Sequence, residues 1–130
     1  MIVLKRKLKD EYSSIEEVYE STCCILEKEG IINNRQNLIN SLIQREQLGP
    51  VQIMSDFYLP HIKSGEVDEL VIANIEGFKD NKVLFIIVPE KDFDMHRECV
   101  IRIIMKLDDE EFLEKMGSSE EVFKEYLECI

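Results

Sequence analysis

The stretch Val83-Leu84-Phe85-Ile86-Ile87-Val88 decides the fold of this 130-residue chain, because six consecutive apolar residues leave neither face of the segment for water. Such a run is typical of a central strand that is covered on both sides. A second apolar segment, residues 70–75, precedes it, and the turn-forming run Gly77-Phe78-Lys79-Asp80-Asn81 lies between the two. A connection this short predicts an antiparallel hairpin rather than a crossover.

The N-terminal part of the chain predicts a strand followed by a helix. Residues 2–8 alternate apolar and basic side chains, which indicates a short strand with an exposed basic face at the edge of a sheet. Ser13 or Ser14 begins the helix, and Glu17 is placed to complete a capping box from Ser14. Gly30 ends this helix.

The next part predicts a second helix and then an ambiguous segment. Asn33 or Asn34 can cap the helix, and Gly49-Pro50 closes it. Residues 51–59 fit neither the helical nor the strand period, so we expect an irregular strand or loop that leads into Pro60-His61.

Three helices are predicted in the last third of the chain, with Asp94, Asp108 and Ser118 as N-caps. Gly117 stops the second of them. An apolar stripe marks the inward face of the first: His96, Val100, Ile103, Ile104 and Leu107. Helices before and after a buried sheet predict a three-layer α/β/α sandwich (α/β, or α+β, class) with a mixed central sheet.

Composition limits the possible functions. A length of 130 residues with 45% hydrophobic residues predicts a single domain over 1–130. The net charge of −11 repels nucleic-acid phosphates and anionic lipids, so we expect no direct nucleic-acid binding. No apolar stretch reaches the roughly 20 residues that span a bilayer, which predicts a cytoplasmic protein without membrane insertion.

The four cysteines point to neither a disulfide scaffold nor a metal site. Cys23, Cys24, Cys99 and Cys129 have no paired CxxC spacing, and we expect reduced core residues. Adjacent cysteines on a helix point about 100° apart and do not share a tetrahedral ion easily. We therefore predict no metal and no cofactor.

The chain has two histidines, and each lies where it could act chemically. Pro60 has a fixed backbone angle, so it should hold His61 in a defined direction after an extended segment. His96 lies at a predicted helix start, where free backbone amides favour an anion. By themselves, these positions also fit a surface loop residue and a helix-start core residue.

Several short motifs, in a fixed order, carry a family resemblance. They are Ser14-Ile15-Glu16-Glu17-Val18, Arg45-Glu46-Gln47-Leu48-Gly49, Leu59-Pro60-His61, and Val88-Pro89-Glu90 followed by His96. In this order the chain resembles the fructose/mannitol-type EIIA domain of the bacterial phosphoenolpyruvate:sugar phosphotransferase system, including EIIA-like domains of transcriptional regulators. The resemblance covers nearly the whole chain.

The resemblance implies a phosphocarrier with a phosphohistidine intermediate. It implies that His61 accepts a phosphoryl group from the phosphocarrier protein HPr and passes it to an EIIB protein or domain. His96 is then the neighbouring family histidine and Arg45 the motif arginine. Fusion to permease or regulator domains is a further possibility of this family.

The residues make this chemistry reasonable. A neutral imidazole has a free ring nitrogen that can attack phosphorus without a strong base. Phosphoryl transfer depends mostly on positioning and charge stabilisation, which a His96 ring N–H and the cations Arg45 or Lys63 could supply. Arg45 could equally be a solvated residue of a helix face.

One segment departs from the family pattern. In the family, the loop before Pro-His usually carries small residues and glycines, whereas this chain has Gln52, Met54 and Asp56 there. Glycine lets backbone approach a phosphoryl group, and a carboxylate facing the site would repel one. This favours, as an alternative, a degenerate regulatory EIIA-like domain of a transcriptional regulator or antiterminator, or more weakly an unphosphorylated interaction module.

Overall fold

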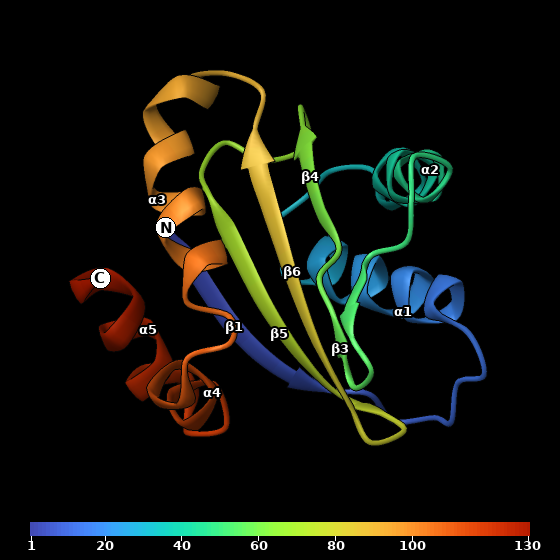
Figure 1. Cartoon of the computed structure of the whole chain (residues 1–130). Coiled ribbons are helices and arrows are strands. Elements are labelled where there is room, and N and C mark those ends of the chain that lie inside the picture. The colour runs from blue at the N-terminus through green and yellow to red at the C-terminus, as the bar shows by residue number, and fades with distance from the viewer.

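The stretch at residues 83–88 lies, as predicted, in the central strand of a sheet and is buried along its whole length. The structure is a computed structural model that describes residues 1–130 (Figure 1). Strand β6 (Asn81–Pro89) pairs antiparallel with β5 (Val71–Phe78), which confirms the hairpin. On its other edge, β5 pairs parallel with β1 (Ile2–Lys7), the predicted edge strand.

The second edge of β6 is occupied by two short strands in succession. These are β3 (Phe57–Tyr58) and β4 (His61–Ser64), both parallel to β6, while β2 (Gln52–Met54) pairs antiparallel with β3. Pro60 separates β3 from β4 because it has no backbone N–H. The ambiguous segment is therefore a small hairpin, and a strand that the sequence did not indicate begins at His61.

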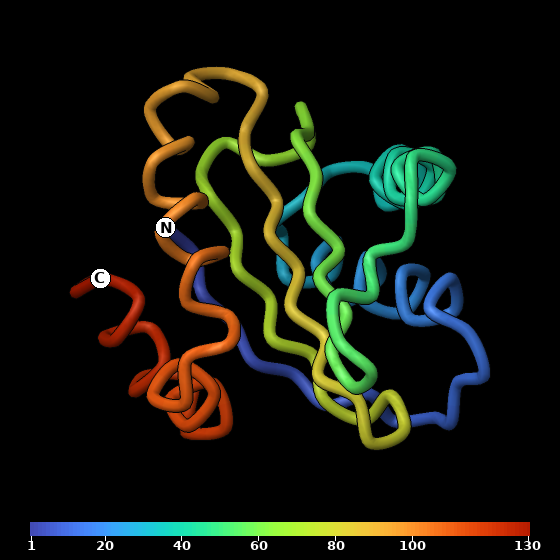
Figure 2. Tube along the Cα trace, viewed as in Figure 1, coloured from blue at the N-terminus to red at the C-terminus, as the bar shows by residue number.

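Helices cover both faces of this sheet, which confirms the three-layer α/β/α architecture (Figure 1). One face carries α1 (Ile15–Lys28) and α2 (Arg35–Glu46); the other carries α3 (Phe93–Met105), α4 (Glu110–Met116) and α5 (Glu120–Cys129). Figure 2 shows both chain termini on the α3–α5 side. None of the five helices is long and apolar enough to cross a membrane.

Side chains of β6 alternate between two hydrophobic cores. Phe85 and Ile87 belong to the core under α1 and α2. Leu84 and Ile86 belong to the core under α3, α4 and α5. Because successive residues of a strand point to opposite faces, a fully apolar strand was needed to build both cores.

The N-caps of α1 and α2 follow the sequence signals. The Ser14 hydroxyl accepts from the Glu17 N–H at 3.4 Å, and the Asn34 side chain accepts from the Asn37 N–H at 3.1 Å. Gly30 has φ +75° directly after the end of α1, a conformation that favours glycine.

The three later caps were each wrong by one or two residues. Asp109 and Ser119 cap α4 and α5 in place of the preceding Asp108 and Ser118, which have the same side chains. Helix α3 begins after Asp92 rather than Asp94; Asp92 has φ +62° and makes no side-chain cap bond, so no capping pattern marks it.

Two predictions about burial were also partly wrong. On α3, Ile103 is fully buried but Ile104 is 38% exposed, because it lies at the margin of the inward face. Of the four free cysteines only Cys23 belongs to the core, where burial raises the pKa of its thiol to about 12. Cys129 is exposed at the end of α5, and the remaining two are half-buried.

Candidate functional site

His61 begins strand β4, and its ring is held by a neighbour in the chain. Its Nδ1 lies 2.8 Å from the carbonyl oxygen of Leu59. The backbone on either side is held as well: the Leu59 N–H donates to the Val51 carbonyl at 2.8 Å, and the Pro60 carbonyl accepts from the Ile86 N–H at 2.9 Å. Since a carbonyl can only accept, Nδ1 carries a proton, and in the neutral imidazole the lone pair is then on Nε2. The nitrogen available as a nucleophile is therefore Nε2.

Arg45, near the end of α2, points its guanidinium at that nitrogen. Its Nη2 lies 3.4 Å from His61 Nε2, and its Nη1 donates to the Gly49 carbonyl at 3.4 Å. Arg45 takes part in none of the salt bridges of the molecule. The structure thus brings together two of the three predicted site residues and leaves a cation beside Nε2 of His61 without a carboxylate partner.

His96 is the fourth residue of α3 and is half-buried. It lies one turn after Phe93, which packs against the core on that face of the sheet. The pKa of Glu69 is lowered mainly by a hydrogen bond to the N-terminal amine, and His96 contributes to this shift. His96 makes no hydrogen bond to His61 or Arg45, so its participation in the site stays a prediction.

Lys63 follows His61 by two residues on β4, so both side chains leave the strand on the same face. The Lys63 Nζ lies 4.9 Å from the centroid of the Phe93 ring, at the start of α3. Strand β4 and the first turn of α3 therefore approach each other on this face.

A residue pair next to Arg45 was missed by the sequence analysis. The Tyr19 hydroxyl donates to Glu46 Oε1 at 2.7 Å and links α1 to the last residue of α2. Burial raises the pKa of Glu46, the Glu16 carboxyl raises it further, and the Tyr19 bond and Arg45 oppose this shift. The position of Tyr19 on the apolar stripe of the first helix was a signal for this pair, because a buried tyrosine needs a hydrogen-bond partner for its hydroxyl.

The hairpin that lacks the family's glycines places its carboxylate away from His61. Asp56 accepts from Lys82 Nζ at 2.8 Å. Lys82 lies four residues before Ile86, the register partner of His61, which corresponds to about 13 Å along β6. None of Gln52, Met54 and Asp56 has a positive φ, so the hairpin does not need glycine for its shape.

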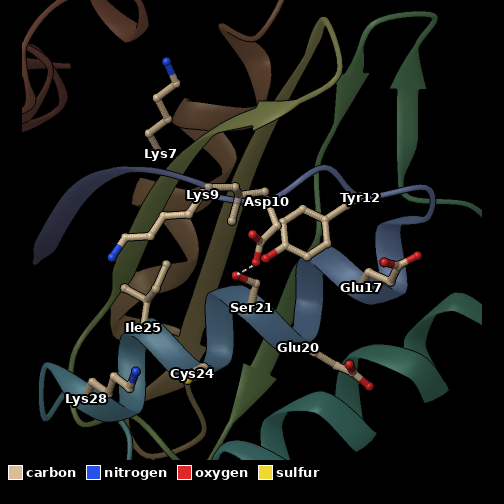
Figure 3. Close-up of a pocket in the computed structure, with 11 residues that line it drawn as sticks. Lys7, Lys9, Asp10, Tyr12, Glu17, Glu20, Ser21, Cys24, Ile25 and Lys28 are labelled. Carbon is tan, nitrogen blue, oxygen red and sulfur yellow. Dashed lines mark hydrogen bonds between the residues drawn. The ribbon is translucent and has the colours of Figure 1, made fainter.

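Neither histidine lines the main cavities of the surface. One cavity of about 430 Å³ lies between the β1–α1 connection and the outer side of α1 (Figure 3). The Tyr12 hydroxyl donates to Ser21 Oγ at 3.1 Å there, among lysines and carboxylates (Figure 3). These elements carry none of the predicted site residues, so this cavity is separate from the candidate site.

Comparison with protein families identifies the chain. Residues 5–128 match the family model described as phosphoenolpyruvate-dependent sugar phosphotransferase system, EIIA 2. The chain belongs to this family. The resemblance found in the sequence motifs is thereby confirmed, although no curated protein sequence matches the chain.

Solved structures of EIIA proteins share the fold. The nitrogen regulatory protein IIA-Ntr of Neisseria meningitidis is similar with a TM-score of 0.69 and 20% identity, over 94% of this chain and 92% of that one. IIA mannitol of Escherichia coli is similar with a TM-score of 0.59 and 18% identity, over 94% of each chain.

The Escherichia coli mannitol enzyme IIA, in its complex with phosphorylated enzyme IIB, is also similar. The TM-score is 0.63 at 16% identity, over 96% of this chain and 94% of that one. At these identities the likeness shows the fold of an EIIA domain.

Proposed function

We propose that this EIIA domain is a phosphocarrier that accepts a phosphoryl group from HPr on Nε2 of His61 and passes it to an EIIB protein or domain. The observation that carries this proposal is the arrangement of the His61 ring, with Nδ1–H bonded to the Leu59 carbonyl and Nε2 facing Arg45. A fixed tautomer presents the lone pair of one nitrogen only.

The proposed reaction needs few groups. The Nε2 lone pair forms a bond to phosphorus while the bond from phosphorus to HPr breaks. Positive charge then develops on the imidazole, and the Leu59 carbonyl stabilises it by accepting the Nδ1–H bond. In the second transfer the bond from Nε2 to phosphorus breaks, and the phosphoryl group passes to EIIB.

Arg45 is the proposed charge-stabilising residue. A guanidinium 3.4 Å from Nε2 can bond phosphoryl oxygens carried on that nitrogen. Because the chain has a net charge of −11, an incoming phosphoryl group needs a local cation to approach. We propose that His96, from the first turns of α3, contributes a further ring N–H donor.

Exposed apolar side chains in the segment that follows Arg45 support docking of a protein partner. Leu48 is 83% exposed three residues after Arg45, and Ile53 and Met54 are exposed on β2. Apolar surface of this kind is typical of protein–protein contacts. We therefore propose that HPr and EIIB meet the domain at this end of α2.

Labelling with phosphoenolpyruvate, purified enzyme I and HPr tests the proposal. We expect one phosphoryl group per chain, stable to base and labile to acid as a phosphohistidine is, and lost when His61 is replaced by Ala. A chain that stays unlabelled while HPr is fully phosphorylated would refute the phosphocarrier function.

A second candidate is a regulatory EIIA-like domain, in which phosphorylation or partner binding at His61 controls another domain. The observation that favours it is the hairpin of β2 and β3, which has larger side chains in the segment where the family usually carries small residues and glycines. In this case HPr labels His61, but onward transfer to EIIB is slow.

A further inference from the structure

We infer that Tyr19 is a positioning residue for the proposed phosphoryl site and acts through Glu46 on the guanidinium of Arg45. This inference rests on the proposed function, in which Arg45 stabilises the phosphoryl group at His61. Tyr19 itself does not contact His61.

The contacts form a closed path that begins and ends on neighbouring residues of β6. The Tyr19 ring packs edge-to-face on Phe85, with the ring centroids 5.9 Å apart. Its hydroxyl donates to Glu46 on α2. The preceding residue, Arg45, contacts His61, and His61 pairs in register with Ile86, next to Phe85.

This path explains why the direction of Arg45 depends on Tyr19. Consecutive residues of a helix point about 100° apart, so Glu46 and Arg45 face different neighbours from the same turn. The end of α2 tightens into i→i+3 bonds, in which the N–H groups of residues 47–49 donate to the carbonyls of residues 44–46 at 3.1 Å. Such bonds have poorer geometry than α-helical ones and hold the turn less firmly. A bond of 2.7 Å from Tyr19 to Glu46 fixes the rotation of this turn and thereby the direction of Arg45.

Tyr19 is itself well suited to act as a fixed point. It is fully buried, and burial together with the Glu46 carboxyl raises the pKa of its phenol well above the ordinary value. The hydroxyl therefore remains a donor over the range in which the protein works. An arginine without a carboxylate partner has no other strong bond to fix it, since its contacts to Gly49 and His61 are both 3.4 Å long.

The experiment is a double-mutant cycle on the rate of phosphoryl acceptance from phosphorylated HPr. Four chains are compared in single-turnover assays over a range of HPr concentrations: wild type, Tyr19→Phe, Arg45→Ala, and the double variant. Tyr12→Phe is the matched control, because it removes the same atom from a tyrosine whose hydroxyl bonds Ser21 in the middle of α1.

We expect Tyr19→Phe to slow the limiting rate by about tenfold, because a small misplacement of a positioned group is costly. The HPr concentration at half-saturation should stay within twofold. In the Arg45→Ala background the same change should alter the rate by less than twofold, because the residue through which it acts is absent. Tyr12→Phe should transfer at the wild-type rate.

Equal slowing by Tyr19→Phe with and without Arg45 would overturn the inference, since Tyr19 would then act on the fold in general. A wild-type rate for Tyr19→Phe would overturn it as well. If the wild type is not labelled at all, the proposed function fails instead. The NMR signal of the Arg45 Nε–H then still reports positioning: a shift in Tyr19→Phe but not in Tyr12→Phe supports it, and no shift refutes it.

Discussion

At the residue scale, His61 and His96 should have separable roles. Replacing His61 by Ala removes the proposed nucleophile and should abolish labelling by phosphorylated HPr. Replacing His96 by Ala should leave labelling but slow the reaction or the onward transfer, because it removes only a proposed donor. A time course of phosphohistidine labelling measures both the loss in His61→Ala and the slowing in His96→Ala.

Both histidine variants should remain folded, because His61 and His96 are only half-buried. Circular dichroism and the melting temperature provide this control. Undiminished labelling of His61→Ala would reject the assignment of the nucleophile, and a His96→Ala chain with wild-type acceptance and transfer would remove His96 from the site.

At the element scale, the packing of α1 on α2 should depend on pH through Glu46. Its pKa is raised in the folded state, so the folded chain binds this proton more tightly than the unfolded chain does. The free energy of unfolding therefore falls as the pH rises from the ordinary pKa through the raised one. Above the raised value this loss is complete.

Glu16→Gln should relieve part of this loss, since the Glu16 carboxylate adds to the rise that burial causes in the pKa of Glu46. We expect the variant to be more stable than the wild type by about 0.5 kcal/mol at pH 7 and unchanged at pH 4, because the pair lies near the surface. Urea denaturation at both pH values measures this. Glu20→Gln is the control for net charge, and an equal gain from it would contradict the explanation.

The hairpin of β2 and β3 is the element that distinguishes the two candidate functions. If its side chains restrict transfer to EIIB, glycine at Gln52, Met54 and Asp56 together should raise that rate severalfold, because a hairpin without these side chains can move its backbone toward the transferring group. Asp56→Gly alone should have little effect, since that carboxylate is paired with Lys82. Rapid-quench transfer from the phosphorylated domain to EIIB is the measurement.

Rapid transfer by the wild type that the triple substitution leaves unchanged would favour the ordinary phosphocarrier over the regulatory domain. A faster Asp56→Gly variant would instead indicate that the carboxylate acts on the site at long range.

At the scale of the whole molecule, one buried polar contact joins the sheet to the α3–α5 layer. The Asn74 side chain on β5 donates to the carbonyl of Met116, at the end of α4, at 2.7 Å. Asn74→Ala leaves that carbonyl without its partner, and we expect a loss of about 2 kcal/mol in the free energy of unfolding. Chemical denaturation measures the loss.

The rate of His61 labelling should not change in Asn74→Ala, because the substituted contact lies on β5 and α4. A slower rate in a fully folded Asn74→Ala chain would show that the site depends on this layer in a way that the described contacts do not explain.

The sequence by itself determined the layers of this protein. A strand that is apolar throughout requires cover on both faces, and the helix periods before and after the hairpin supply that cover. Local chemistry also narrowed each of the first two caps to two adjacent residues, of which the structure uses Ser14 and Asn34. The order of short motifs identified the family.

Only the tertiary structure decided what surrounds His61. The approach of Arg45 and the Tyr19–Glu46 link join distant parts of the chain through sheet register and helix packing, and neither follows from local periodicity. Asp92 as a cap and β4 as a strand were missed for the same reason, because backbone contacts rather than side-chain patterns define them. Local sequence sets which faces must be buried, whereas the pairing of distant segments sets which side chains meet.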